Sequence, residues 1–256
     1  MSKLEQRFPQ KRVLITGATT GFGEALAYQL AARGWKVAVT GRKLDAVKRT
    51  AKKVTELGGT GLGMTLEVRE KSQWQTVSKA LDKAWGGIDI LVNNAGVADA
   101  NSFDQIDDAA WDKLIATNLD GVINGCRTYS PEMSKNNSGY ILNMASAAGL
   151  LAFPEMANYN VSKAGVIGLS ETLFTELSRF NIGVTVLCPA GFQSSLAANA
   201  VRDGSSFGDS STARQVKADM DKGKHTSETV AAYAIKAMEK GDLYSIPQRE
   251  YQLVWM

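Results

Sequence analysis

The stretch RVLITGATTGFGEALAYQLAARG, from Arg12 to Gly34, joins an apolar run, a glycine-rich turn and a helical pattern. Residues 12–17 are rich in β-branched and apolar side chains, which favours a strand. Residues 24–33 carry apolar side chains at helical spacing, and Gly34 stands where a helix can end. A strand, a glycine turn and a helix in direct succession predict the start of an α/β fold.

The same alternation continues along the chain. Further strands are expected at 36–41, 61–68, 88–96, 140–146, 182–191 and 242–247. Helices are expected at 44–57, 71–85, 109–133, 159–180 and from Thr226, as the N-cap, to Gly241. The strands are apolar on successive residues, as expected when helices cover both faces of a sheet. We therefore predict a Rossmann-like α/β fold, a doubly wound parallel β-sheet of about seven strands.

Length and composition limit what the chain can be. With 256 residues and 44% apolar content, one domain spanning 1–256 is expected, with the Ser-, Gly- and Asp-rich segment 194–225 as a surface excursion near the site. The net charge of +3, from 29 basic and 26 acidic residues, does not indicate a nucleic-acid partner. No apolar run approaches the roughly 18 residues of a membrane span. Cys126 and Cys188 match no metal site, and free buried thiols predict a reducing, cytoplasmic location.

The glycine turn TGATTGFG holds Gly17, Gly21 and Gly23. Glycines there let backbone N–H groups and a helix N-terminus approach a pyrophosphate, although a plain strand-to-helix turn is the alternative. The second strand ends in VTGRK, with Gly41 and Arg42 where an acidic ribose ligand is expected in an NAD-binding fold. A guanidinium suits a 2′-phosphate, which predicts NADP(H) in preference to NAD(H). The alternative is that Arg42 belongs to a solvated basic face.

Together with other motifs, this turn resembles the short-chain dehydrogenase/reductase family. The resemblance runs from about Lys11 to Ser194 and rests on motifs in a fixed order, namely TGATTGFG, NNAG (93–96), Asn118 in ATNLDG, Ser146 in NMASAAG, YNVSK (159–163) and the CPAGF turn (188–192). Each motif alone is modest evidence. In this order, and on these predicted elements, they are specific for the family and for its nicotinamide-dependent oxidoreductase chemistry.

The YNVSK motif places a phenol and an ammonium four residues apart, on one face of a predicted helix. A tyrosine titrates near pH ~10, and the Lys163 ammonium, with the positive ring of the oxidised cofactor, is expected to favour the Tyr159 phenolate. That would bring a proton donor toward the working pH. An exposed helix pair is the structural alternative for Tyr159 and Lys163 alone.

Two further positions complete the catalytic set that the resemblance implies. Ser146 stands 13 residues before Tyr159, the family's interval, at the carboxyl end of a predicted strand, where its hydroxyl would polarise the substrate oxygen. Asn118 lies inside a predicted helix, where asparagine is unfavourable, and by the resemblance supports a kink and a water chain to Lys163. An ordinary serine turn is the alternative for Ser146.

The resemblance also implies the residues that meet the cofactor. Glu67 and Val68 would lie at the adenine end, although the family usually has Asp at the position of Glu67. Asp89 would brace the turn that lines the ribose. In the nicotinamide turn, Pro189-Ala190-Gly191-Phe192, the glycine is displaced by one position from the family's Pro-Gly pattern. The expected cofactor-binding residues are Gly17, Thr19, Thr20, Gly21, Phe22, Gly23, Arg42, Glu67, Val68, Asn94, Ala95, Gly96, Tyr159, Lys163, Pro189, Phe192 and Ser194.

These residues predict an NADP(H)-dependent enzyme that reduces a ketone or aldehyde to an alcohol, or the reverse. Apolar residues that could line a pocket for a hydrophobic small molecule are Leu150, Leu151, Phe153 and Met156, with Phe103 and Phe192 as further candidates. Core or subunit contacts are the alternative for this group. By the resemblance, a homodimer or homotetramer is expected through the helices that carry Asn118 and Tyr159.

Two other functions compete with this prediction. A non-catalytic NADP-binding sensor or scaffold on the same fold would not need Asn118, Ser146, Tyr159 and Lys163 together. The run GSSFG, with Ser206 and the single histidine His225 after it, matches a serine-hydrolase motif in letters. That motif needs a strand before it and a helix after it, whereas polar segments surround this one.

Overall fold

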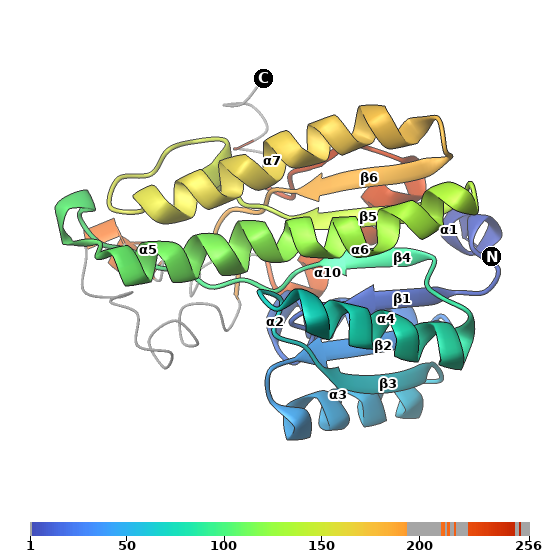
Figure 1. Cartoon of the computed structure of the whole chain (residues 1–256). Helices are drawn as coiled ribbons and strands as arrows, with labels where there is room; N and C mark the ends of the chain where they lie inside the picture. Colours follow the sequence, from blue (N-terminus) through green and yellow to red (C-terminus); the bar gives the residue numbers. More distant parts are fainter. Residues whose placement is uncertain are drawn as a thin grey trace.

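Seven parallel strands form one sheet in the order β3-β2-β1-β4-β5-β6-β7 in the computed structural model (Figure 1). The structure describes residues 2–193, 211–212, 214–215, 218, 225–248 and 251. The strands are β1 Arg12–Ile15, β2 Lys36–Gly41, β3 Thr60–Thr65, β4 Ile90–Asn93, β5 Gly139–Met144, β6 Ile182–Leu187 and β7 Tyr244–Ser245. The predicted doubly wound sheet and each predicted strand are confirmed, β2 at its predicted bounds and the other strands shorter than predicted.

Helices cover the two faces of the sheet (Figure 1). The helices are α1 Lys3–Arg7, α2 Gly21–Ala31, α3 Leu44–Glu56, α4 Lys71–Trp85, α5 Asp108–Ile115, α6 Gly121–Lys135, α7 Ala157–Ser178 and α10 Ser227–Lys240. Short 3-10 turns occupy Phe103–Gln105 and Ala147–Gly149. The helices α2 and α10 share a core layer on one face, and α4, α6 and α7 share the layer on the other face. None of the helices within the described part of the chain is long and apolar enough to cross a membrane.

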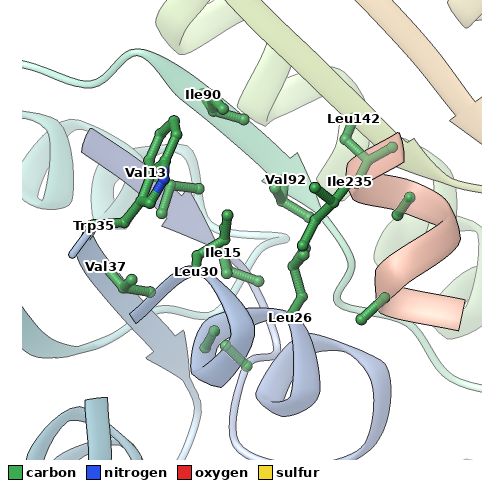
Figure 2. Packing of buried hydrophobic residues seen from close by; sticks show 14 of the residues in the cluster. Val13, Ile15, Leu26, Leu30, Trp35, Val37, Ile90, Val92, Leu142 and Ile235 are labelled. Carbon is green, nitrogen blue, oxygen red and sulfur yellow. The ribbon is translucent and has the colours of Figure 1, made fainter. Parts of the chain in front are cut away.

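The side chains of each central strand alternate between the two faces of the sheet, and helices cover both faces, so successive residues are buried. In β1, Val13 and Ile15 point into the layer of α2 and α10, in one cluster with Leu26 and Ile235 (Figure 2), and Leu14 points into the other layer. All three strand residues are fully buried. Burying each such side chain contributes roughly 1.5–3 kcal/mol. The unbroken apolar runs in the sequence therefore reflect two cores, one on each side.

The helix predicted over 109–133 is interrupted by a π-helical turn, Ala116–Asp120, which separates α5 from α6. A π turn adds one residue to the helical circuit and often marks a functional position. The structure thus places a π turn at Asn118, the position where the resemblance implies a kink.

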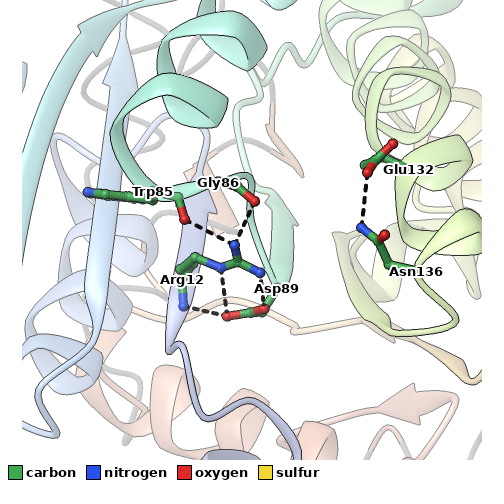
Figure 3. Close-up of polar contacts among 6 residues, drawn as sticks. All are labelled: Arg12, Trp85, Gly86, Asp89, Glu132 and Asn136. Carbon is green, nitrogen blue, oxygen red and sulfur yellow. Dashed lines mark hydrogen bonds and ion pairs between the residues drawn. The ribbon is translucent and has the colours of Figure 1, made fainter.

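Asp89 lies at the amino end of β4, where it pairs with Arg12 (Figure 3). Its carboxylate accepts hydrogen bonds from the backbone N–H of Arg12 at 2.8 Å and from the guanidinium at 2.7 Å. The expectation that Asp89 braces the ribose turn is wrong, because β4 carries that turn at its opposite, carboxyl end. Asp89 instead fixes the register of β1 against β4.

Candidate active site

The functional motifs converge at the carboxyl edge of the sheet, around the place where the strand order reverses between β1 and β4. Ligands of open α/β sheets bind in the crevice at this switch point. The glycine turn follows β1, the NNAG segment follows β4, Ser146 follows β5 and the Pro189 turn follows β6. These segments lie far apart in the sequence, but they meet because parallel strands present all their carboxyl ends at one edge of the sheet.

The glycine turn requires its glycines. Gly17 has φ +61° and Gly21 has φ +59°, a region that favours glycine. A Cβ on Gly23 would stand 2.5 Å from Asn94 Nδ2, and one on Gly17 would stand 2.9 Å from Ala95 Cα. The turn thus packs directly against the segment after β4 with no space for side chains.

Thr16 and Asn94 tie these two segments together. The Thr16 hydroxyl accepts hydrogen bonds from the N–H groups of Asn94 at 2.9 Å and Ala95 at 3.0 Å. The Asn94 amide donates to the carbonyls of Thr16 at 2.8 Å and Gly17 at 3.1 Å. Asn94 and Ala95, predicted as ribose contacts, therefore also shape the glycine turn, and Thr16 is a site residue that the motif reading missed.

The N-terminus of α2 is open toward this turn. Its N-cap Thr20 makes no side-chain hydrogen bond to the first helical amides. Four N–H groups at a helix start lack helical partners, and they favour an anion. Together with the crowded glycines, this arrangement fits a dinucleotide pyrophosphate.

Arg42 stands at the far end of the same edge, where β2 ends. It is exposed and lines a shallow cleft of about 470 Å³ with Thr65, Glu67, Gln73 and Thr76. A Cβ on Gly41 would lie 3.2 Å from Thr19 Cγ2 and 3.3 Å from Val47 Cγ1, so an acidic side chain at 41 would be crowded. The guanidinium is thus the charged group that the end of β2 presents to the cleft.

Glu67 faces Arg42 across this cleft, and its backbone N–H donates to Gln73 Oε1 at 2.8 Å. Its carboxylate accepts a hydrogen bond from the Arg69 guanidinium at 3.0 Å. Burial opposes ionisation of Glu67, but the hydrogen bonds of Arg69 and the charges of Arg69 and Arg42 outweigh it, so the pKa of Glu67 is lowered. An ionised carboxylate therefore stands beside the guanidinium.

Val68 is buried under α6, where its contacts hold the segment after β3 against neighbouring helices. Its carbonyl accepts hydrogen bonds from Trp74 Nε1 at 2.9 Å and Asn124 Nδ2 at 3.1 Å. A Cβ on Gly121 would lie 2.8 Å from Val68 Cγ2, which shows how closely α6 approaches.

Ser146, Tyr159 and Lys163 come together at the ends of β5 and α7. Lys163 Nζ lies 5.6 Å from the centre of the Tyr159 ring and donates to the Met144 carbonyl at 2.9 Å. Tyr159 and Lys163 are 7% and 4% exposed, which excludes an exposed helix pair. A Cβ on Gly149 would lie 2.6 Å from the Lys163 carbonyl carbon, so the serine turn packs directly on α7.

Burial controls the titration of this pair. It raises the pKa of Tyr159 to about 12, and a hydrogen bond with Ser146 acts in the opposite direction. Burial also lowers the pKa of Lys163 to about 8, and a smaller electrostatic interaction with the Cys188 thiol acts in the opposite direction. The expected lowering of the Tyr159 pKa is not produced by the protein's own groups, because desolvation of the phenolate exceeds their stabilising effect.

Asn118 is fully buried in the π turn and binds the segment after NNAG. Its Oδ1 accepts from the Val97 N–H at 2.8 Å, and its Nδ2 donates to the Val97 carbonyl at 2.9 Å and to Ser162 Oγ at 3.3 Å. A Cβ on Gly96 would lie 3.2 Å from Asn118 Oδ1 and 3.7 Å from Lys163 Nζ. Asn118 therefore joins the NNAG segment to α7 beside Lys163.

Asp99 and Asn158 form a second support that the motifs did not reveal. The buried Asn158 donates from Nδ2 to Asp99 Oδ2 at 3.2 Å and accepts at Oδ1 from the N–H of Tyr159 at 2.8 Å. This link fixes the first turn of α7, and with it the backbone of Tyr159. Only the adjacency of Asn158 to Tyr159 was visible in the sequence.

The turn after β6 reaches Ser146 through the buried Pro189. The Pro189 carbonyl accepts from the Ala147 N–H at 2.9 Å and from Ser146 Oγ at 3.4 Å. Phe192, expected at the cofactor, packs against the core layer of α2 and α10. Ser194 lies outside the described residues.

The short chain dehydrogenase family model matches residues 11–204, more than half of the chain. The chain belongs to the short-chain dehydrogenase family. It is 36% identical over 195 residues to the 3-oxoacyl-(acyl-carrier-protein) reductase FabG of Staphylococcus epidermidis, covering 75% of this chain and 79% of that protein. This short-chain dehydrogenase is thus an oxidoreductase, and its family favours that chemistry over the hydrolase alternative, whose Ser206 lies outside the described residues.

Two solved structures resemble this short-chain dehydrogenase at 29% identity. A short-chain dehydrogenase/reductase from Burkholderia phymatum in complex with NAD has a TM-score of 0.88 and covers 95% of this chain and 90% of that chain. A metagenomic short-chain oxidoreductase in complex with NADP has a TM-score of 0.68 and covers 71% and 83%. The family therefore includes proteins with either cofactor.

The predicted apolar residues of this short-chain dehydrogenase divide among different surroundings. Met156 and Phe153 pack with Tyr159 in one small cluster that also holds Val97, Ala98, Ala100, Leu114 and Ala148. Leu150 packs against the layer of α4, α6 and α7 instead. Phe103 is 72% exposed, in edge contact with Trp111. The wall next to the phenol is therefore formed by the 97–100 segment, Phe153 and Met156.

Proposed function

We propose that this short-chain dehydrogenase uses NADP(H) to reduce a hydrophobic ketone or aldehyde to an alcohol, or catalyses the reverse reaction, with Tyr159 as the proton donor. The observation that carries the proposal is the buried pair of Tyr159 and Lys163, with the half-buried Ser146, beside an apolar wall at the edge where a dinucleotide fits the glycine turn. A non-catalytic sensor would have no use for a buried ammonium next to a buried phenol.

In the proposed reaction, the bound nicotinamide supplies or accepts the hydride. The Ser146 hydroxyl, which donates to the Pro189 carbonyl at 3.4 Å, turns its single proton to the substrate oxygen when substrate binds and polarises the carbonyl. Tyr159 transfers its hydroxyl proton to the oxygen as negative charge develops there. Lys163, held by the Met144 carbonyl, stabilises the phenolate that remains.

At neutral pH Tyr159 is in the protonated form that carbonyl reduction requires. With a pKa raised to about 12, the phenol holds its proton at neutral pH and is ready to donate it. Alcohol oxidation needs the phenolate as base, so it should require the charge of the oxidised cofactor or alkaline pH.

Arg42 and the crowding around Gly41 support NADP(H) as the preferred cofactor. A ribose with a free 2′-hydroxyl gains from an acidic ligand at the end of β2, and here Thr19 and Val47 crowd that position. The exposed guanidinium offers forked donors to a 2′-phosphate instead. The negative charge of Glu67 beside Arg42 weakens the preference for NADP(H), but the guanidinium and the crowding at Gly41 remain.

The substrate is proposed to be hydrophobic near its carbonyl group. Met156, Phe153 and the alanines of the 97–100 segment present apolar surface around the Tyr159 ring. The relatives named 3-oxoacyl reductases are consistent with a ketone bearing an apolar chain.

A homodimer or homotetramer is proposed through the face that carries α7. Val161 is 50% exposed and Phe174 is 36% exposed on that helix, which is more apolar surface than a solvated helix needs.

The test is an absorbance assay at the nicotinamide band with NADPH and NADH against a panel of hydrophobic and polar ketones and aldehydes. We expect consumption of NADPH with hydrophobic carbonyl compounds and a lower KM for NADPH than for NADH. Absence of turnover with every carbonyl compound, despite tight NADPH binding, would favour the sensor instead.

A further inference from the structure

The turn from Pro189 to Gly191 is closed by a side chain from the C-terminal part of the chain. Gln248 is 2% exposed, and its Oε1 accepts from the Ala190 N–H at 3.0 Å. Its Nε2 donates to the Gly191 carbonyl at 3.5 Å. One amide group thus meets a donor and an acceptor of consecutive residues in the turn.

The strand pair β6·β7 brings Gln248 to this place. Val186 N–H donates to the Leu243 carbonyl at 2.7 Å, and Cys188 N–H donates to the Ser245 carbonyl at 2.8 Å. Backbone pairing along β6 stops there, and the next N–H after Pro189 goes to the Gln248 side chain. Residue 189 faces β5, where its carbonyl accepts the Ala147 N–H, so Ala190 carries the next N–H on the β7 side, and a side chain takes the place of a backbone carbonyl there.

The same turn contacts the catalytic group on its other side. The Pro189 carbonyl accepts the Ser146 hydroxyl and the Ala147 N–H, while the next two residues are held by Gln248. A buried amide whose partners are lost leaves unsatisfied polar groups away from water, so the turn is strongly favoured in this one position.

We propose that Gln248 is a positioning residue that fixes the Pro189–Gly191 turn and thereby sets both the Ser146 hydroxyl and the backbone facing the nicotinamide. The inference rests on the proposed function, because it takes that turn to face the cofactor. Gln248 lies beyond residues 11–204, which the family model matches, so the support comes from this chain's own C-terminal segment.

The test compares Gln248→Glu and Gln248→Met with the parent chain. Gln248→Glu keeps the shape and the acceptor for Ala190 but replaces the donor to Gly191 by a carboxylate oxygen that repels its carbonyl. The dissociation constants of NADPH and NADP⁺ are measured by fluorescence titration without substrate, and the exchange of the Ala190 amide is followed by NMR. Gln29→Met is the matched control, since it removes an amide that donates to the Glu228 carbonyl at 2.8 Å, between α2 and α10.

We expect Gln248→Glu to weaken NADPH binding about tenfold near pH 8, which corresponds to the loss of about one hydrogen bond to a buried group. Lowering the pH toward 5 should restore much of the affinity, relative to the parent, because protonation of the new carboxyl returns a donor. Gln248→Met should weaken binding further and speed exchange of the Ala190 amide about tenfold. Gln29→Met should bind as the parent does.

Parent-like affinity of Gln248→Glu at both pH values would overturn the proposal, even if Gln248→Met fails to fold. Weakened NADPH binding of Gln248→Glu that does not recover at low pH would overturn the proposal as well, because the missing donor would then not be the cause of the weakening. These readouts need no turnover. A parent chain that binds NADPH but reduces no carbonyl compound would defeat the proposed function and leave the role of Gln248 in cofactor binding to be judged on affinity alone.

Discussion

Replacing Lys163 by methionine should stabilise the fold at neutral pH while abolishing turnover. Lys163 is 4% exposed, and burial lowers its pKa from the ordinary 10.5 to about 8. That difference corresponds to about 3 kcal/mol of unfolding free energy lost at pH 7, at about 1.4 kcal/mol per pH unit. Methionine fills a similar volume without the charge, but it loses the hydrogen bond to the Met144 carbonyl, worth about 1 kcal/mol.

The net expectation is a variant that is about 2 kcal/mol more stable than the parent at pH 7, or roughly 4–8 °C in Tm. Between pH 8 and 10.5 the folded parent binds fewer protons than the unfolded chain, so the stability of the parent rises with pH. The advantage of Lys163→Met should therefore be full below pH 8, shrink by about 1.4 kcal/mol per pH unit above it, and vanish near pH ~9.5.

Urea unfolding of both proteins at pH 7, 8, 9 and 9.5 measures this difference. Lys79→Met, which removes an exposed lysine from α4, is the control for the change of net charge. A variant that is less stable than the parent at pH 7, by the same amount at all four pH values, would refute the reasoning. A buried ammonium that destabilises the fold is expected where chemistry requires it.

Two other substitutions test the frame of the site. Glu67→Gln removes the carboxylate beside Arg42 and should tighten NADP(H) binding about twofold to fivefold, as for a surface charge pair, with NAD(H) binding much less affected. Equal changes for both cofactors in fluorescence titrations would count against the placement of the 2′-phosphate. Gly149→Ala places a Cβ 2.6 Å from the Lys163 carbonyl carbon and should destabilise the protein by about 1–3 kcal/mol and lower kcat more than it changes cofactor affinity. A variant with parent-like unfolding and kcat would show that the serine turn and α7 can separate freely.

The sheet was predictable because its signals are local. An apolar run such as Val13 to Ile15 indicates a strand that is covered on both faces. A glycine such as Gly17 indicates a turn with positive φ. Both signals can be read from neighbouring residues in the sequence. The Tyr159 and Lys163 pair was predictable for the same reason, since helical periodicity alone places the two on one face.

Contacts between distant segments were not predictable. Gln248 meets Ala190 across 58 positions, and nothing near either residue announces the pairing. The Tyr159 pKa was expected to fall because Lys163 is visible in the sequence, whereas the burial that raises it depends on the packing of Met156 and the 97–100 segment. Electrostatic effects of burial need the tertiary structure.

The central claim is that Tyr159 gives a proton to a carbonyl oxygen. Its most direct test is the kcat of Tyr159→Phe for NADPH-dependent reduction of a hydrophobic ketone, together with the NADPH dissociation constant of the same variant. We predict a fall in kcat of about 10²–10⁴-fold, the range for loss of a general acid, with NADPH affinity changed little. Turnover within tenfold of the parent at unchanged NADPH affinity would contradict the assignment of Tyr159.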